Sequence, residues 1–182
     1  MIFLEATRLQ ELEIESIRVR QETQQRAVVL RVKDSNLFLP IFVGHFEVEA
    51  IRLKLMDIEV QRPMTHDLLD SIIDNLGATV DKIIVSELKE DTFYAKIIVN
   101  YDSRTFEIDA RPSDAIALAV RSGASIFAEE SVLEKAGVNI EEKDLDQATD
   151  ADISMLEDEV VNLSAFSDFI DSLDLEDLGE SR

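Results

Sequence analysis

The first part of the chain alternates apolar and polar residues, as β-strands with one buried face do. Within residues 12–19 the alternation changes phase near Ser16, which predicts a β-bulge. Residues 27–32 and 37–43 are apolar and β-branched, and turn-forming residues join them at positions 34–36. This stretch therefore predicts a β-hairpin or meander.

Helical spacing of apolar residues follows. Gly44 breaks the strand pattern, and residues 46–56 predict a first helix. The clearest helical pattern is the next one, in which apolar residues recur at i, i+1, i+4, i+5 and i+8, namely Leu68, Leu69, Ile72, Ile73 and Leu76. Thr65 is the predicted N-cap of this second helix, and Gly77 is predicted to end it.

Short apolar runs then predict three more strands, at residues 79–87, 92–100 and 104–110. Their connections are so short that neighbouring strands should be antiparallel. A third helix at residues 113–121 is apolar on almost every side, which predicts burial. A strand at 125–128 and a helix at 129–136 complete the body, which we expect to end near Ile140. The predicted fold class is α+β, a mostly antiparallel sheet packed against helices.

The chain beyond this body is strongly acidic. Residues 141–182 contain 15 acidic residues against Lys143 and Arg182, a net charge of −13, which leaves −8 of the formal −21 for residues 1–140. Apolar residues keep helical spacing there, at Leu156, Val160, Leu163, Phe166, Phe169, Ile170 and Leu173. We therefore divide the chain into an α+β domain, 1–140, and an acidic C-terminal helical extension, 141–182. The extension either packs on its own domain or dimer mate, or binds a partner from a disordered state.

Composition excludes several classes of function. Without cysteine, the chain has no disulfide, no thiolate zinc site and no cysteine nucleophile. We found no signal peptide, no membrane-spanning run and no nucleotide-binding or serine-hydrolase motif, so we expect a cytoplasmic protein without an organic cofactor or a membrane partner. The acidic body argues against general nucleic-acid binding. The 6% aromatic content argues against base stacking.

Two arginine-proline pairs mark the ends of extended runs. Arg62-Pro63 precedes Met64-Thr65-His66-Asp67, and Arg111-Pro112 precedes Ser113-Asp114-Ala115-Ile116. Proline fixes φ and is favoured in the first turn of a helix, so each pair predicts a strand-to-helix junction. At such junctions, free helix amides and loop side chains converge to hold anions, metals or substrates.

These junctions, together with the motifs 39–44 and 49–51 in the same order, resemble the bifunctional nuclease domain family, also known as domain of unknown function 151. The resemblance covers residues 12–137. It implies an α+β fold, a homo-oligomer, and nuclease activity on RNA and DNA, the activity for which plant members are named.

The resemblance directs attention to the chemistry of the two junctions. A metal-assisted nuclease needs an activated water and stabilised phosphoryl charge. The candidate catalytic residues are His66, Asp67 and Asp114, of which Asp67 and Asp114, with Asp109, are candidate ligands for Mg²⁺ or Mn²⁺. Arg62, Arg111 and Ser113 are candidate substrate-binding residues. Two further candidates are His45, which would join His66 if the two corners were adjacent, and Glu49, preferred over Glu47 because it matches the family's Glu-Ala pair.

The same residues have a structural interpretation. Asp67 and Asp114 stabilise helix N-termini by position alone, His66 would hydrogen-bond a nearby carbonyl, and each arginine of a junction would pair with its own aspartate. Two functions therefore remain open. One is a nuclease acting at the junctions, and the other is a non-enzymatic oligomeric scaffold whose acidic tail engages a basic protein partner.

Overall fold

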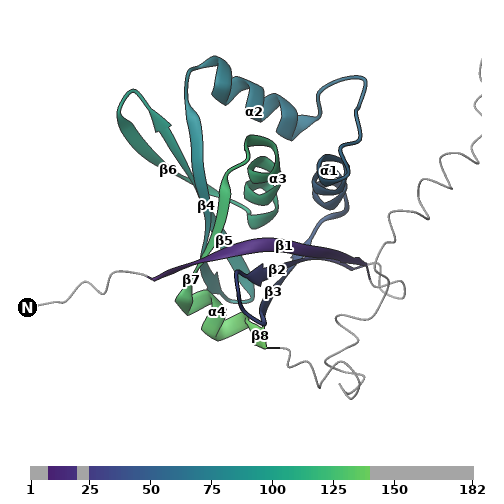
Figure 1. The fold of residues 1–182 in the computed structure, drawn as a ribbon, viewed down its shortest axis with the longest axis vertical. Coiled ribbons are helices and arrows are strands. Elements are labelled where there is room, and N and C mark those ends of the chain that lie inside the picture. The colour runs from purple at the N-terminus through teal and green to yellow at the C-terminus, as the bar shows by residue number, and fades with distance from the viewer. Residues whose placement is uncertain (1–7, 20–24, 140–182) are drawn as a thin grey trace, which may run out of the picture.

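The computed structural model describes residues 8–19 and 25–139, which form an α+β fold with one mostly antiparallel sheet (Figure 1). The strands are β1 (Leu9–Val19), β2 (Arg26–Val32), β3 (Leu37–Val43), β4 (Thr79–Lys89), β5 (Thr92–Tyr101), β6 (Arg104–Ala110), β7 (Ser125–Glu129) and β8 (Val138–Asn139). The helices are α1 (His45–Leu55), α2 (Thr65–Asn75), α3 (Pro112–Ser122) and α4 (Glu130–Ala136). The predicted acidic helical extension lies outside the described residues.

The eight described strands form one sheet in the order β6-β5-β4-β7-β1-β2-β3-β8. Neighbouring strands are antiparallel except for β4 and β7, which are parallel because α3 crosses between β6 and β7. The predicted bulge is confirmed, since the register of β1 against β2 shifts between Ile14 and Ser16. The short β8, which pairs with β3 at Leu37 and Phe38, was not predicted.

Tight turns explain why β4, β5 and β6 form a meander. Glu90 and Asp91 connect β4 to β5 with φ angles of 48° and 58°, and Asp102 and Ser103 connect β5 to β6 with 48° and 59°. Positive φ at both central residues is the geometry of a two-residue hairpin whose twist matches that of its strands. The short connections thus place β5 between β4 and β6, as the sequence predicts.

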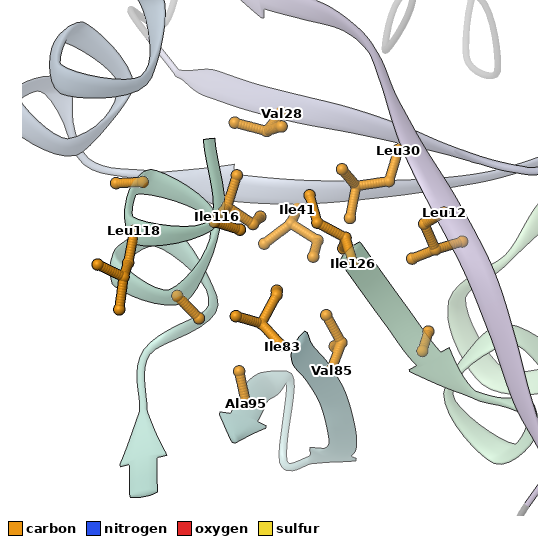
Figure 2. Packing of buried hydrophobic residues seen from close by; sticks show 14 of the residues in the cluster. Leu12, Val28, Leu30, Ile41, Ile83, Val85, Ala95, Ile116, Leu118 and Ile126 are labelled. Carbon is orange, nitrogen blue, oxygen red and sulfur yellow. The ribbon is translucent and has the colours of Figure 1, made fainter. Parts of the chain in front are cut away.

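Helix α3 lies at the centre of the core. Its residues Ala115 to Ala119 are all buried, which confirms the prediction of a buried helix. Figure 2 shows Ile116 of α3 facing apolar side chains from the strands, among them Val28 and Ile41, while Leu118 lies on the other side of the helix. Pro112 occupies the first turn of α3, and Gly123, with φ of 72°, ends it in the left-handed conformation. Because α3 also contacts α1 and α2, it positions both neighbouring helices.

Helix α2 differs from its prediction in two respects. Its N-cap is Met64 rather than Thr65, because Asp67 accepts a hydrogen bond from the Met64 backbone N–H (2.7 Å). The chain therefore becomes helical at Thr65, one residue earlier than predicted. Its apolar stripe is also largely uncovered. Leu68, Leu69 and Ile72 are exposed, and the inner side of α2 instead buries His66.

Candidate functional site

The first turns of three helices meet at one cluster of polar side chains. Glu47 comes from α1, His66 from α2 and Asp114 from α3, and Arg111 is the N-cap residue of α3. Arg111 donates to Asp114 through Nε (2.7 Å) and Nη2 (3.1 Å), and Nη2 also donates to Glu47 Oε1 (2.8 Å). The cluster therefore joins residues that are 64 positions apart in the chain. We call Glu47, His66, Arg111 and Asp114 the junction cluster.

His66 is oriented by Asp114. Its Nε2 lies 3.1 Å from Asp114 Oδ1, and since a carboxylate only accepts hydrogen bonds, Nε2 carries the proton in this contact. In the neutral ring the acceptor is then Nδ1. Nδ1 makes no hydrogen bond within the described residues. Every fully buried side-chain nitrogen or oxygen in those residues has a hydrogen-bond partner, so Nδ1 is not fully buried and reaches solvent. A proton acceptor fixed by a carboxylate thus opens to the surface.

The electrostatics of the cluster keep Asp114 ionised. Burial raises the pKa of the Asp114 carboxyl, but the hydrogen bonds from Arg111 and His66 outweigh burial, so its pKa lies below the ordinary 3.8. The side chain of Arg111 is 67% exposed, so an anion in solvent can reach its guanidinium. The free amides of three helix N-termini add partial positive charge beside it.

Asp67 belongs to a separate, interior arrangement. Arg121, whose side chain is only 4% exposed, donates through Nε to Asp67 (2.6 Å), through Nη1 to the Ala117 carbonyl (2.8 Å) and through Nη2 to the Ala50 carbonyl (3.0 Å). One guanidinium therefore ties α2, α3 and α1 together behind the junction cluster. Burial raises the pKa of Asp67, and its hydrogen bonds from Met64 and Arg121 outweigh this, so the pKa is lowered.

The two arginine-proline pairs consequently differ. The expected pair of Arg111 with Asp114 forms, whereas Arg62 does not pair with Asp67, because Arg121 already occupies that carboxylate. Arg62 is exposed and makes no ion pair with any described residue. Sequence analysis missed Arg121 as the partner of Asp67, since the two lie 54 positions apart and no local motif connects them.

The other candidates lie at varying distances from the cluster. Ser113 is largely buried in the first turn of α3. Its hydroxyl makes no hydrogen bond to a described residue and, since no such group there is fully buried, it reaches solvent. Asp109 is exposed on β6 opposite Lys96. Of the two glutamates, Glu47 reaches the cluster, while Glu49, the one preferred from the sequence, pairs with Arg52 (2.7 Å) outside it. The ring of His45 packs against that of Phe46 rather than joining His66.

The donor set does not fit the expected metal site in this arrangement. Both oxygens of Asp114 accept from Arg111 or His66, and both oxygens of Asp67 accept from Arg121 or Met64. Within residues 8–19 and 25–139, no group of three or more histidine and carboxylate side chains is placed to hold a metal ion. A cation at Asp114 would compete with the Arg111 guanidinium for the same two oxygens. The metal ligands predicted from the sequence therefore stay a prediction.

Fold and site together define an α+β protein with a histidine, a carboxylate and an exposed guanidinium gathered at helix N-termini. The chain belongs to the bifunctional nuclease domain family, whose domain matches residues 28–141. An uncharacterised protein of Mycobacterium tuberculosis (strain ATCC 25618 / H37Rv), Rv1829, is 38% identical over 167 residues, which cover 92% of this chain and 96% of that protein. The predicted resemblance is thereby confirmed.

Plant relatives are more distant. Bifunctional nuclease 1 of Oryza sativa subsp. japonica is 25% identical over 128 residues, covering 68% of this chain and 39% of the rice protein. Bifunctional nuclease 1 of Arabidopsis thaliana is 28% identical over 99 residues, covering 52% of this chain and 30% of that protein. The shared segment is thus a minority of each plant protein. In the described part of the present chain, no helix is long and apolar enough to cross a membrane.

Proposed function

We propose that this protein hydrolyses phosphodiester bonds in nucleic acid at the junction cluster. The observation that carries the proposal is the contact of His66 with Asp114 beside the exposed Arg111, in a chain of the bifunctional nuclease domain family. The plant relatives, which are named bifunctional nucleases, suggest nucleic acid as the substrate class. The geometry supplies a general base, its orienting carboxylate and a cation for the phosphoryl group.

Proton transfer falls to His66 in this proposal. Its Nδ1 takes a proton from the attacking water or hydroxyl as that oxygen bonds to phosphorus, while Asp114 accepts from Nε2 and stabilises the imidazolium that results. The P–O bond to the leaving oxygen breaks, and that oxygen takes a proton from solvent, to which the imidazolium returns its own. Asp114 can do so because its lowered pKa keeps it ionised at neutral pH. A positioned general base of this kind contributes about 10² to 10⁴ in rate.

Charge stabilisation falls to Arg111 and the helix N-termini. As the phosphorus is attacked, negative charge grows on its non-bridging oxygens, and the Nη1 group of Arg111, which donates to no described residue, can donate to them. Glu47 and Asp114 hold Arg111 in place and at the same time reduce its net attraction for phosphate. Ser113, whose hydroxyl reaches solvent, lies next to Asp114 and offers a further hydrogen bond to the substrate.

Metal assistance is kept as a variant of this proposal. Divalent cations would supply Lewis acidity and offset the repulsion between an acidic chain and a polyanion. Because Asp114 orients His66 directly, the proposed proton transfer needs no metal for that purpose. Dependence on Mg²⁺, Mn²⁺ or Zn²⁺ would show that the arginine contacts give way to a cation.

The chain's two histidines provide a matched test. We would measure cleavage of single-stranded and double-stranded RNA and DNA by the full chain, with each cation or with chelator, for the wild type, His66→Ala and His45→Ala. His66→Ala should lower the rate at least about 100-fold, and His45→Ala, on the exposed side of α1, should change it less than about threefold. Thermal unfolding of each variant separates loss of chemistry from loss of fold.

Two outcomes would overturn the proposal. One is an absence of cleavage by the wild type under every cation condition, and the other is cleavage that survives in folded His66→Ala, which would point to a contaminating nuclease. His66→Gln gives a second variant, because its amide can keep a hydrogen bond to Asp114 without accepting a proton at neutral pH.

The alternative is a non-enzymatic scaffold or regulator. One observation favours it: Asp67 was a catalytic candidate, yet Arg121 engages it in the interior, as expected for a residue that holds helices together. In that case the acidic extension would engage a basic protein partner. An inactive wild type would make capture of such a partner by the full chain the next experiment.

A further inference from the structure

More than half of the large apolar side chains exposed in the described residues lie on two neighbouring elements. On α2 and its C-cap these are Leu68, Leu69, Ile72 and Leu76, with exposed fractions between 37% and 67%. On the hairpin of β5 and β6 they are Tyr101, Phe106 and Ile108. We call these seven residues the α2–β6 surface. Monomeric proteins seldom leave so many large apolar residues together in water.

The β6 part of this surface is an uncovered continuation of the core. Phe106 pairs with Val99 and Ile108 with Ile97, so all four side chains lie on the same face of the sheet. Val99 and Ile97 belong to the buried core, whereas Phe106 and Ile108 are 44% and 48% exposed. Among the described elements, no helix covers β6 as α3 covers β5.

The two parts of the surface are continuous. The chain leaves α2 through Gly77 and enters β4 at Thr79, which pairs with Asn100, the neighbour of Tyr101. Tyr101 pairs in turn with Arg104, the first residue of β6. The C-terminal end of α2 and the beginning of β6 therefore lie at the same end of the sheet, and Figure 1 shows them on either side of the upper end of β4.

We propose that the α2–β6 surface is the interface of a two-fold symmetric homodimer, in which α2 of each copy packs on the uncovered face of β6 of the other. An apolar helix stripe and an apolar sheet face are complementary to each other, but within one chain they cannot meet, because α2 already packs on α3 and β4. A two-fold axis brings each of them against its complement in the second copy.

Charges around the surface also favour a second copy. The outward side of α2 beside the stripe carries the uncharged residues Thr65, Ser71 and Asn75. The last turn of α2 contains Asp74 and no basic residue, which leaves the negative end of the helix without a cation of its own. Arg104 is exposed at the start of β6 and makes no ion pair with any described residue, so it is available to that end of the partner's helix.

Sedimentation equilibrium of the full chain tests the interface independently of any nuclease activity. The wild type should sediment at twice the mass of one chain. Ile72→Glu on α2 and Phe106→Glu on β6 should each raise the dimer dissociation constant about 100-fold or more, because each buries an unpaired carboxylate in the interface. Arg104→Glu should raise it less. The matched control is Phe46→Glu, which changes the most exposed phenylalanine of the described residues, on α1 and outside the surface, and should leave the dimer intact.

Mixing the two disrupted variants tests the proposed contact of α2 with β6. A heterodimer of Ile72→Glu with Phe106→Glu keeps one undamaged contact between α2 and β6, whereas each variant alone damages both. The mixture should therefore form dimers at concentrations where neither variant does. A monomeric wild type, a dimer indifferent to Ile72→Glu, or a mixture that stays monomeric would each overturn the proposal. Circular dichroism of each variant checks that the chain remains folded.

Discussion

The two arginine-proline junctions each begin a helix with an aspartate in its first turn, and yet they serve different purposes. At the junction that begins α3, Arg111 and Asp114 pair within one helical turn, at the surface, and hold His66 and Glu47 from other helices. At the junction that begins α2, Asp67 turns inward to Arg121, and Arg62 is left in solvent. The first arrangement leaves charged groups accessible for chemistry, and the second holds three helices together.

The comparison teaches that a motif specifies a helix start more reliably than it specifies the partner of the charge placed there. Both aspartates occupy the first helical turn, where they interact favourably with the helix dipole. The partner depends on which guanidinium the tertiary fold brings within reach. For Asp67 that guanidinium comes from the last turn of α3.

The largest effect should come from breaking the interior junction. Arg121→Ala leaves the carboxylate of Asp67 and the carbonyl of Ala50 without their shared donor, so we expect a loss of about 3 kcal/mol or more in unfolding free energy. Urea unfolding followed by circular dichroism measures it. Arg62→Ala is the matched control at the same junction and should change stability by less than about 0.5 kcal/mol. A loss below about 1 kcal/mol for Arg121→Ala would contradict an organising role for this residue.

Removing the arginine of each junction in turn, and measuring the cleavage rate, sharpens the comparison further. Arg111→Ala removes the exposed guanidinium from the junction cluster and should lower the cleavage rate about 100-fold, while stability changes little because the pair is largely exposed. Arg62→Ala should lower the rate less than about tenfold. Equal losses for the two variants would mean that both arginines contact substrate and that the junctions are functionally alike.

Acid should weaken both junctions. The pKa values of Asp67 and Asp114 lie below the ordinary 3.8, so each ionised carboxylate contributes stability that is present above that value and is lost as pH falls through the lowered pKa. Unfolding free energy should therefore fall steeply below about pH 4. Asp67→Asn and Asp114→Asn should each flatten this slope in urea unfolding measured from pH 5 to pH 2. An unchanged slope in both variants would contradict the cause assigned here.

The smallest effect concerns Asp70, on the same helix as Asp67 but with a pKa shifted the other way. Burial and the neighbouring Asp74 raise the pKa of Asp70, so its charge at pH 7 is unfavourable in the folded state. Asp70→Asn should raise the unfolding free energy at pH 7 by a few tenths of a kcal/mol, with no gain near pH 3, where the aspartate is protonated. Destabilisation at pH 7 would show that Asp70 has a favourable partner.

Local patterns account for most of the fold. The predicted bulge in β1, the boundaries of β3 and β6, the antiparallel order of β4 to β6 and the burial of α3 all agree with the structure, because alternation, turn residues and helical spacing act over a few residues. The missed elements were short or depended on context. The two residues of β8 carry too little pattern to be recognised, and the N-cap moved from Thr65 to Met64 because the Asp67 carboxylate accepts from the Met64 amide.

The site was predictable only in part. Sequence reasoning selected His66, Arg111, Ser113 and Asp114, and the structure places them in or beside one cluster. It did not select Glu47 over its neighbour Glu49, since helical spacing alone does not show which side of α1 faces α3. The position of Arg121 at the end of the apolar helix α3 was the one signal in the sequence that it has a buried partner, because a charge on a buried helix requires one.

The chain's own pattern specified what is local: strands from alternation, helix starts from proline and aspartate, turns from residues that tolerate positive φ, and family membership from ordered motifs. Packing of distant elements decided the rest. It chose Arg121 over Arg62 for Asp67, brought His66 to Asp114 across 48 positions, and left the stripe of α2 outside the core. The physical reason is that hydrogen bonds and dihedral preferences act between near neighbours, whereas ion pairs and apolar contacts form wherever the folded chain brings their members together.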